Sequence, residues 1–143
     1  MITEHKQSAG SGYEIQVWAK QGCSEADRLI GILSSLPFLT DNFCDFSIEE
    51  AQILIGVLFP TKATKVYVEK STYHLKHLFE TISCVIGRIK HGGMKCCAVA
   101  TLVYAFKQQG FTYRGTGVHW YMNLSAKEVN NIYRCFGHLH HHR

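Results

Sequence analysis

The feature that most constrains this chain is the stretch from His91 to Phe106, which begins as a basic glycine turn and becomes strongly apolar. Within its last eleven residues only Thr101 is clearly polar. The run is too short for a transmembrane helix, which needs about 18–20 apolar residues. It is also too uniformly apolar for an ordinary surface helix. We therefore predict a helix at about 95–109 that is buried nearly all round, lies at the centre of the fold and carries two cysteines in its first turn.

The length and composition indicate one globular domain without bound groups. A chain of 143 residues with 46% hydrophobic and 18% charged residues can bury a full core. The six cysteines show no CxxC pairing for zinc, so we expect them to be reduced and expect no metal and no cofactor. The polar N-terminal residues lack the apolar centre of a signal peptide, which predicts a cytoplasmic protein without a membrane span. We expect a flexible lead at 1–12, a single domain at 13–137 and a histidine-rich tail at 138–143.

Helix caps and apolar periodicity predict four further helices. Ser47 and Ser125 are each followed by glutamate three residues later, the capping-box pattern. Ser71 precedes the clearest amphipathic stripe in the chain. A rival interpretation makes 52–59 a buried strand, because isoleucine and valine are frequent there. We expect helices at about 24–35, 48–58, 72–90 and 125–136.

Alternating apolar and polar residues predict four short strands. Two of them, at 13–19 and 64–69, are separated from other strands by helices. The other two, at 111–115 and 118–123, flank a Gly-Thr-Gly sequence that is typical of a hairpin. The resulting order is β-α-α-β-α-α-β-β-α. We predict an α+β fold in which a small, mostly antiparallel sheet packs against about five helices.

The charge of the chain is divided unevenly between its halves. Residues 1–60 carry three basic and eight acidic side chains, a net charge of −5, whereas residues 61–143 carry twelve basic and three acidic ones, a net charge of +9. Two explanations remain open. The basic half can present a face that binds anions or an acidic partner, or the two halves can attract each other within one domain.

Cysteine and histidine in the second half form a candidate catalytic pair. A cysteine in the first turn of a helix is activated by the helix dipole, so Cys96 is the candidate nucleophile and Cys97 the substitute. His119 begins a predicted strand, where it is the candidate base and shares one face with Asn123. A cysteine at a helix start followed by a histidine on a strand resembles the core of papain-like and transglutaminase-like enzymes. That resemblance implies a cysteine hydrolase or transferase, whereas the simpler explanation is that these residues pack the core.

A second candidate site is basic. Lysine and arginine alternate with tyrosine in the second half, a composition that can bind phosphates and stacked bases. The sequence contains no standard nucleic-acid motif, no Walker A sequence and no GxGxxG. Glycines before a helix can also hold one anionic group. The candidate residues for binding an anion or a partner are Lys65, Arg88, Lys90, Gly92, Gly93, Lys95 and Arg114.

These observations favour a protein that works by binding. The chain is short, has few carboxylates in its second half and contains no specific catalytic motif. We expect a non-catalytic adaptor or regulatory protein whose charged surfaces attract a protein partner, either an acidic protein or a larger complex. The alternatives are the cysteine enzyme and a nucleic-acid-binding protein that uses the basic half.

Overall fold

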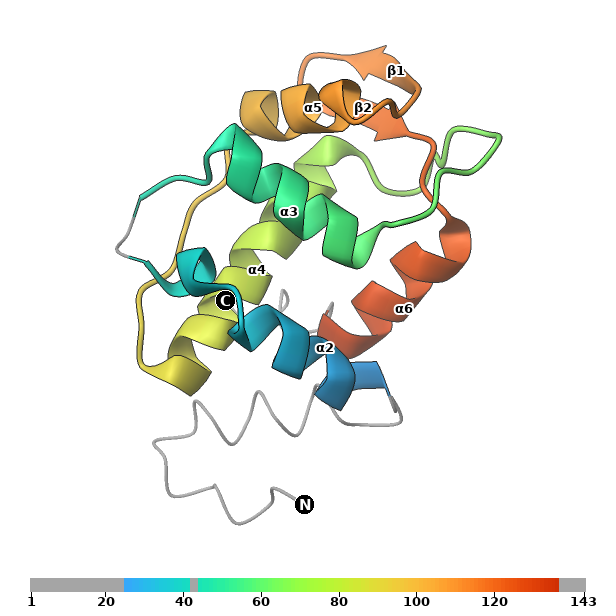
Figure 1. Cartoon of the computed structure of the whole chain (residues 1–143). Coiled ribbons are helices and arrows are strands. Elements are labelled where there is room, and N and C mark those ends of the chain that lie inside the picture. The colour runs from blue at the N-terminus through green and yellow to red at the C-terminus, as the bar shows by residue number, and fades with distance from the viewer. Residues whose placement is uncertain (1–24, 42–43, 137–143) are drawn as a thin grey trace.

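The computed structural model describes residues 25–41 and 44–136, and this part of the chain is mainly helical, with one β-hairpin at one end of the molecule (Figure 1). Its α+β class is as predicted. The elements in chain order are α2 (Glu25–Ser34), the 3-10 helix η2 (Pro37–Thr40), α3 (Ile48–Leu58), α4 (Thr72–Lys90), α5 (Val99–Gln108), β1 (Tyr113–Thr116), β2 (His119–Met122) and α6 (Ala126–Phe136).

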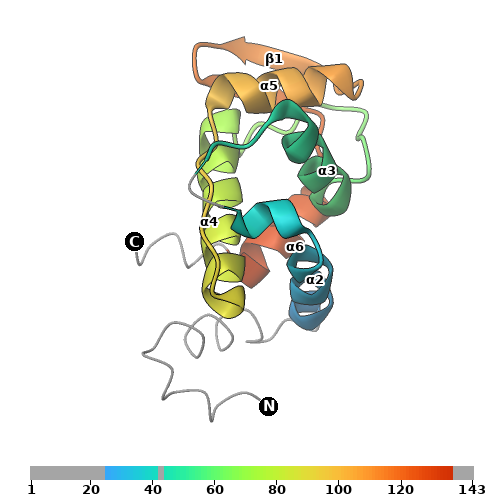
Figure 2. The same cartoon turned by 60° about the vertical axis from the view of Figure 1, so that its left-hand side comes forward.

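The central helix is α4, not the helix predicted at 95–109. α4 contacts α2, η2, α5, β2 and α6, and Figure 2 shows it running along the molecule between the hairpin end and the α2 end. Eleven of its residues are buried, whereas α5 has four buried residues and leaves Tyr104 49% exposed. The prediction of a helix buried nearly all round is wrong because the apolar side chains of α5 lie on two of its faces. One face packs on the core, and the other lines a groove beside the hairpin.

The remaining helix predictions are confirmed, and the capping side chains explain where two of the helices begin. Ser47 accepts a hydrogen bond from the backbone of Glu50, whose carboxylate returns one from the backbone of Ser47. Ser71 caps α4 in the same way, with His74 in the position that glutamate usually takes. These caps are local in sequence, so they fix the helix starts without help from the rest of the fold.

α5 starts later than predicted because the chain before it is held extended. The backbone N–H of Lys95 donates to Ser83 Oγ at 2.7 Å, and that of Cys97 donates to Glu80 Oε2 at 2.8 Å. The carbonyl of Cys96 accepts from the backbone N–H of Phe46 at 2.9 Å. Side chains of α4 and the segment before α3 thus take the backbone groups that a helical turn would need. Both cysteines therefore precede the helix instead of lying in its first turn.

The sheet is smaller than predicted. The hairpin is confirmed, with Thr116 opposite His119 in an antiparallel pair, but no strand forms at 64–69. The amide of Tyr67 donates to the carbonyl of Met122, and that of Ala63, just before the segment, donates to the carbonyl of Asn123; these two bonds do not make a regular ladder. Val68 is 54% exposed, so the segment has no buried apolar face to hold a strand register. The predicted strand at 13–19 lies outside the described residues, and the predicted order of elements is not matched.

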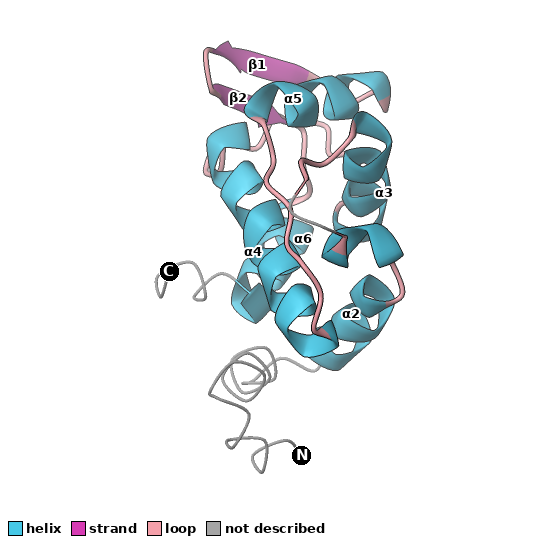
Figure 3. Ribbon diagram, turned by 90° about the vertical axis from the view of Figure 1, so that its left-hand side faces the viewer, coloured by secondary structure: helices cyan, strands magenta, loops and turns pink. Residues whose placement is uncertain are grey.

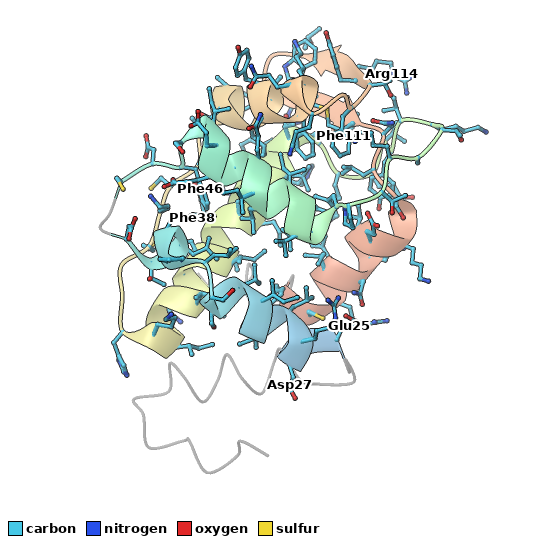
Figure 4. The ribbon with its side chains drawn as sticks, in the orientation of Figure 1. Glu25, Asp27, Phe38, Phe46, Phe111 and Arg114 are labelled. Carbon is cyan, nitrogen blue, oxygen red and sulfur yellow. The ribbon has the colours of Figure 1, made fainter. Side chains whose placement is uncertain are left out.

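Aromatic side chains join the helices around the core. Phe46 lies 5.9 Å from Phe79 of α4 and 6.3 Å from Phe38, measured between ring centroids, and Figure 4 shows Phe38 and Phe46 beside each other. At the hairpin end, Phe106 of α5 contacts Phe111 at 5.0 Å. These edge-on contacts connect α5 and the chain entering the hairpin to the same core as α4.

The cysteines differ in state. Cys135 is buried in α6 and disulfide-bonded, so the expectation that all cysteines are reduced is wrong at this position. Cys44, Cys84, Cys96 and Cys97 are free.

Among the described helices, none combines the length and the apolar character that crossing a membrane requires.

Candidate functional site

A groove with mainly apolar walls lies between α5 and the hairpin, which are neighbours at one end of the molecule (Figure 3). Its volume is about 410 Å³. This is within the range of about 300–1,000 Å³ found for small-ligand sites. One wall comes from α5 and the other from the hairpin turn and β2. The lining residues are Val99, Ala100, Val103, Tyr104, Lys107, Gly117, Val118 and Trp120.

The two faces of α5 explain why the groove exists. Leu102, Ala105 and Phe106 are fully buried and pack toward the core. Ala100 and Tyr104 are exposed on the other side of the helix and line the groove, so α5 has apolar residues on both sides. Tyr104 is 49% and Val118 is 44% exposed. An exposed apolar surface that is concave indicates a binding site more strongly than scattered apolar residues do.

Lys107 brings positive charge into the groove. Its Nζ lies 4.3 Å from the centre of the Tyr113 ring and 4.7 Å from that of Trp120. The indole N–H of Trp120 donates to the carbonyl of Gly117 at 2.9 Å, which fixes the ring against the hairpin turn. The sequence has no aspartate or glutamate between Glu80 and Glu128, so neither wall carries a carboxylate. The groove therefore combines apolar walls with a cation that no carboxylate of either wall compensates.

The hairpin wall is attached to the first turn of α4. Thr72 Oγ1 donates to the carbonyl of Val118 at 2.9 Å and accepts from the backbone N–H of Trp120 at 3.1 Å. Ser71 Oγ lies 2.9 Å from His119 Nδ1. Thus three consecutive hairpin residues are held by two buried hydroxyl groups.

The hairpin turn itself depends on glycine. Gly117 has a φ of 64°, and Gly115 has a φ of 142°; both lie in the region that favours glycine. A Cβ atom at Gly115 would also lie 2.1 Å from the carbonyl oxygen of His119, so a larger residue cannot fit there. The predicted Gly-Thr-Gly signal thus belongs to the part of the fold that forms one wall of the groove.

A histidine cluster surrounds Ser71 beside this attachment. His74 Nδ1 accepts from the backbone N–H of Ser71 at 3.1 Å and lies 3.2 Å from its Oγ. The rings of His74 and His119 are 6.4 Å apart, and Tyr73 contacts both. Burial lowers the pKa of His74, and the positive charges of Lys70, His119 and His77 lower it further. Within residues 25–41 and 44–136, no three side chains of the metal-binding types come together as metal ligands.

The predicted catalytic residues have separate surroundings. Burial raises the pKa of the Cys97 thiol to about 12, with Glu80 adding to the effect. Cys96 is exposed. His119 Nδ1 contacts Ser71, not a cysteine. Asn123 uses both ends of its amide, accepting from the backbone N–H of Thr112 and donating to the carbonyl of Ala63, each at 2.8 Å. In the described part of the chain, neither cysteine hydrogen-bonds to His119 or to Asn123.

The predicted basic residues are also dispersed. Lys65 and Arg88 are exposed, and Arg114 is exposed on β1, as Figure 4 shows at the hairpin end. Lys90 donates to the carbonyl of Ser34 at 2.6 Å. The structure therefore places Arg114 on the hairpin and Lys90 beside α2.

The predicted glycine site has its amides occupied. The N–H of Gly92 donates to the carbonyl of Gly87 at 2.7 Å, and that of Gly93 donates to the carbonyl of Thr40 at 2.9 Å. A Cβ atom at Gly92 would lie 2.6 Å from the Cβ of Thr40. These glycines therefore allow a close approach between the end of α4 and η2.

Lys95 is buried, with 1% of its side chain exposed. Its Nζ lies 3.2 Å from Glu50 Oε1 and donates to Cys44 Sγ at 3.1 Å. Burial lowers the pKa of Lys95, but its hydrogen bonds to Cys44 and Glu50 outweigh this, so the pKa lies above its ordinary value. Lys95 thus joins the segment before α5 to the start of α3.

The sequence reasoning missed Lys107, Val118 and Trp120 as functional residues. The available signal was Tyr104, a residue with a polar tip in a run read as wholly buried. A tyrosine and a lysine three residues apart on one helix face indicate that this face is not in the core. The position of the neighbouring hairpin wall could not be inferred, because it depends on Thr72 of α4, which lies 46 positions before Val118.

A second hollow, of about 800 Å³, lies along α6 and is lined by charged and amide side chains, among them Lys127, Asn130 and Arg134. Its lining is more polar in proportion than that of the groove, so this surface remains better hydrated. The groove between α5 and the hairpin is therefore the better candidate site.

Comparisons with known proteins found no matching family model, no matching curated protein and no matching solved structure.

Proposed function

We propose that this protein is a non-catalytic binding protein whose groove between α5 and the hairpin holds an apolar segment of a partner protein. The observation that carries the proposal is the exposure of Tyr104 and Val118 on opposite walls of a concave surface. Burying these side chains against a partner releases hydrating water, which favours association by about 25 cal/mol for each Å² of apolar surface.

The charge around the groove indicates what such a segment carries. Lys107 lines it and Arg114 is exposed on the neighbouring strand, while the chain between Glu80 and Glu128 supplies no carboxylate. An aspartate or glutamate in the partner would pair with Lys107 without displacing an existing ion pair on these walls. Complementary charge of this kind speeds encounter and selects among partners more than it adds affinity. We therefore infer that the bound segment is apolar with at least one acidic residue.

The dimensions indicate how the segment binds. A groove of about 410 Å³ accommodates a few side chains, not a whole domain face. Interfaces of this kind depend on a small number of anchors, often aromatic residues in the partner or the site. Trp120 is held in place by its hydrogen bond to Gly117, so little conformational entropy is lost at this anchor when a partner binds.

Selection from a random peptide library displayed on phage tests the proposal. We expect the selected peptides to be enriched in large apolar residues and in aspartate or glutamate. Binding should be lost in Val118→Glu, which places a negative charge in the groove. The matched control is Ile53→Glu, because Ile53 is 48% exposed on α3 and does not line the groove. Selected peptides that bind both variants equally would overturn the proposal.

A second candidate function is binding of single-stranded nucleic acid. It is favoured by Lys107 lying over both Tyr113 and Trp120, since aromatic rings beside cations can stack bases. The aliphatic residues on the α5 wall favour the protein partner instead. Binding of a labelled oligonucleotide that weakens steeply with added salt would support the second function.

A further inference from the structure

The attachment of the hairpin to α4 contains a pair of histidines that share one hydroxyl group. Ser71 Oγ lies 2.9 Å from His119 Nδ1 and 3.2 Å from His74 Nδ1, and it also accepts from the backbone N–H of Tyr73 at 3.2 Å. The backbone N–H of Ser71 donates to His74 Nδ1 at 3.1 Å. His74 must therefore carry no proton on Nδ1 for this cap to form, because a protonated ring nitrogen cannot accept a hydrogen bond.

Protonation of His74 reverses this contact. The Nδ1–H of an imidazolium would face the N–H of Ser71, and two donors at that distance repel each other. The positive end of the α4 dipole lies at the same place, and it disfavours a cation. The groups around the ring that carry or gain positive charge are Lys70 from the preceding loop, His77 from α4 and His119 from β2, while Tyr133 of α6 donates to the carbonyl of His74.

Protonation of His119 has a related effect. Ser71 Oγ has one hydrogen to donate, and it already accepts from Tyr73, so it cannot receive hydrogen bonds from both imidazolium rings in good geometry. The rings are 6.4 Å apart, which places two positive charges close together in acid. His119 is exposed.

We propose that His74 and His119 form an acid-sensitive latch whose protonation loosens the attachment of the hairpin to α4. The contact that is lost is that of His119 with Ser71, and its neighbours Val118 and Trp120, which line the groove, are then held by Thr72 alone at this attachment. Mild acid therefore loosens one wall of the groove and releases the partner segment bound there. This last consequence rests on the proposed binding function, whereas the latch itself does not.

Hydrogen exchange of the protein without any partner tests the latch. Protection of the backbone amides of residues 112–124 is measured at about pH 7.5 and about pH 5.5, on either side of the ordinary histidine pKa of about 6.5. After correction for the intrinsic effect of pH, we expect protection of these amides to fall several-fold in acid. Amides in the middle of α4 should keep their protection.

His74→Gln is the decisive variant, because glutamine keeps the capping acceptor and does not titrate. It should retain the neutral-pH protection of the hairpin and lose most of the fall in acid. His91→Asn is the matched control: it removes a histidine at the far end of α4, where asparagine also tolerates the left-handed backbone, and the acid response should remain. An unchanged fall in His74→Gln would overturn the proposal.

A second variant, His119→Gln, covers the case in which His74→Gln does not fold. It leaves the α4 cap intact and should reduce the acid response by itself; a full response in this variant would also contradict the latch. Because no partner is present, these results do not depend on the groove binding a peptide. A latch that works in a protein that binds no selected peptide would contradict the proposed function alone.

Discussion

Lys107 on α5 reaches across to Trp120 on β2, with its Nζ 4.7 Å from the centre of the indole ring. The same ammonium group lies 4.3 Å from the ring of Tyr113 on β1. One side chain thus bridges the two walls of the groove and contacts both strands of the hairpin. This contact has a structural and a functional consequence, because the lysine holds the hairpin to α5 and supplies the charge that a partner meets.

Replacing Lys107 by methionine should weaken the attachment of the hairpin. A cation over an aromatic ring at a partly exposed site contributes about 0.5–1 kcal/mol. We expect a loss of that size in the free energy of unfolding measured with urea. Lys107→Arg should keep most of the stability of the unchanged protein, since guanidinium also stacks on aromatic rings. Lys65→Met, at an exposed lysine outside the groove, is the control and should change stability little.

Thr72 should contribute more to the free energy of unfolding than the size of its side chain suggests. Its buried hydroxyl satisfies both the carbonyl of Val118 and the N–H of Trp120. Thr72→Val keeps the shape but leaves these groups unpaired, at a cost of about 1–3 kcal/mol. Thr72→Ser keeps the hydroxyl and should lose clearly less. Equal losses for the two variants in urea unfolding would show that the methyl group, not the hydrogen bonds, carries the effect.

The free energy of unfolding should decrease in mild acid. Burial and the nearby cations hold the pKa of His74 below its ordinary value. Above about pH 6.5, the ordinary histidine pKa, this residue is neutral in the folded and unfolded chains and has no effect. As the pH falls below that value, the unfolded chain takes up a proton before the folded chain does, so unfolding becomes easier. Urea unfolding across this range should show a smaller decrease for His74→Gln than for the unchanged protein.

The thiols should differ in reactivity in a way that bears on the cysteine-enzyme alternative. Cys97 is buried with a pKa of about 12, so almost none of it is thiolate at neutral pH. Cys96 is exposed and should react with iodoacetamide in the folded protein. Peptide mapping after brief labelling should find Cys96 modified and Cys97 unmodified until urea is added. Rapid labelling of Cys97 in the folded protein would contradict its described environment.

Local signals in the sequence were sufficient for most of the helices. Ser47 with Glu50 predicts the start of α3, and the apolar stripe after Ser71 predicts the whole of α4. Both depend on residues within a few turns of each other. The hairpin was also predictable, because its glycine turn joins strands that are adjacent in the chain.

The candidate site was harder to predict because its contacts are distant in sequence. Lys95 looked like a surface cation, but it is buried against Glu50, 45 positions earlier. The first turn expected at Cys96 and Cys97 is replaced by hydrogen bonds to α4 and to the segment before α3. His119 was read as a partner of cysteine, yet it contacts Ser71. In each case the side chain's type was recognised, while its partner depended on how the helices pack.

Mapping a bound peptide by NMR tests the central claim most directly. A peptide selected for binding is titrated into protein labelled with ¹⁵N, and the backbone shifts are followed. We predict that the largest changes occur at Val99, Ala100, Tyr104 and Lys107 and at residues 117–120, and that Val118→Glu abolishes them while Ile53→Glu does not. Changes centred on Lys127, Asn130 and Arg134 of α6, with the groove unaffected, would contradict the assignment of the groove as the binding site.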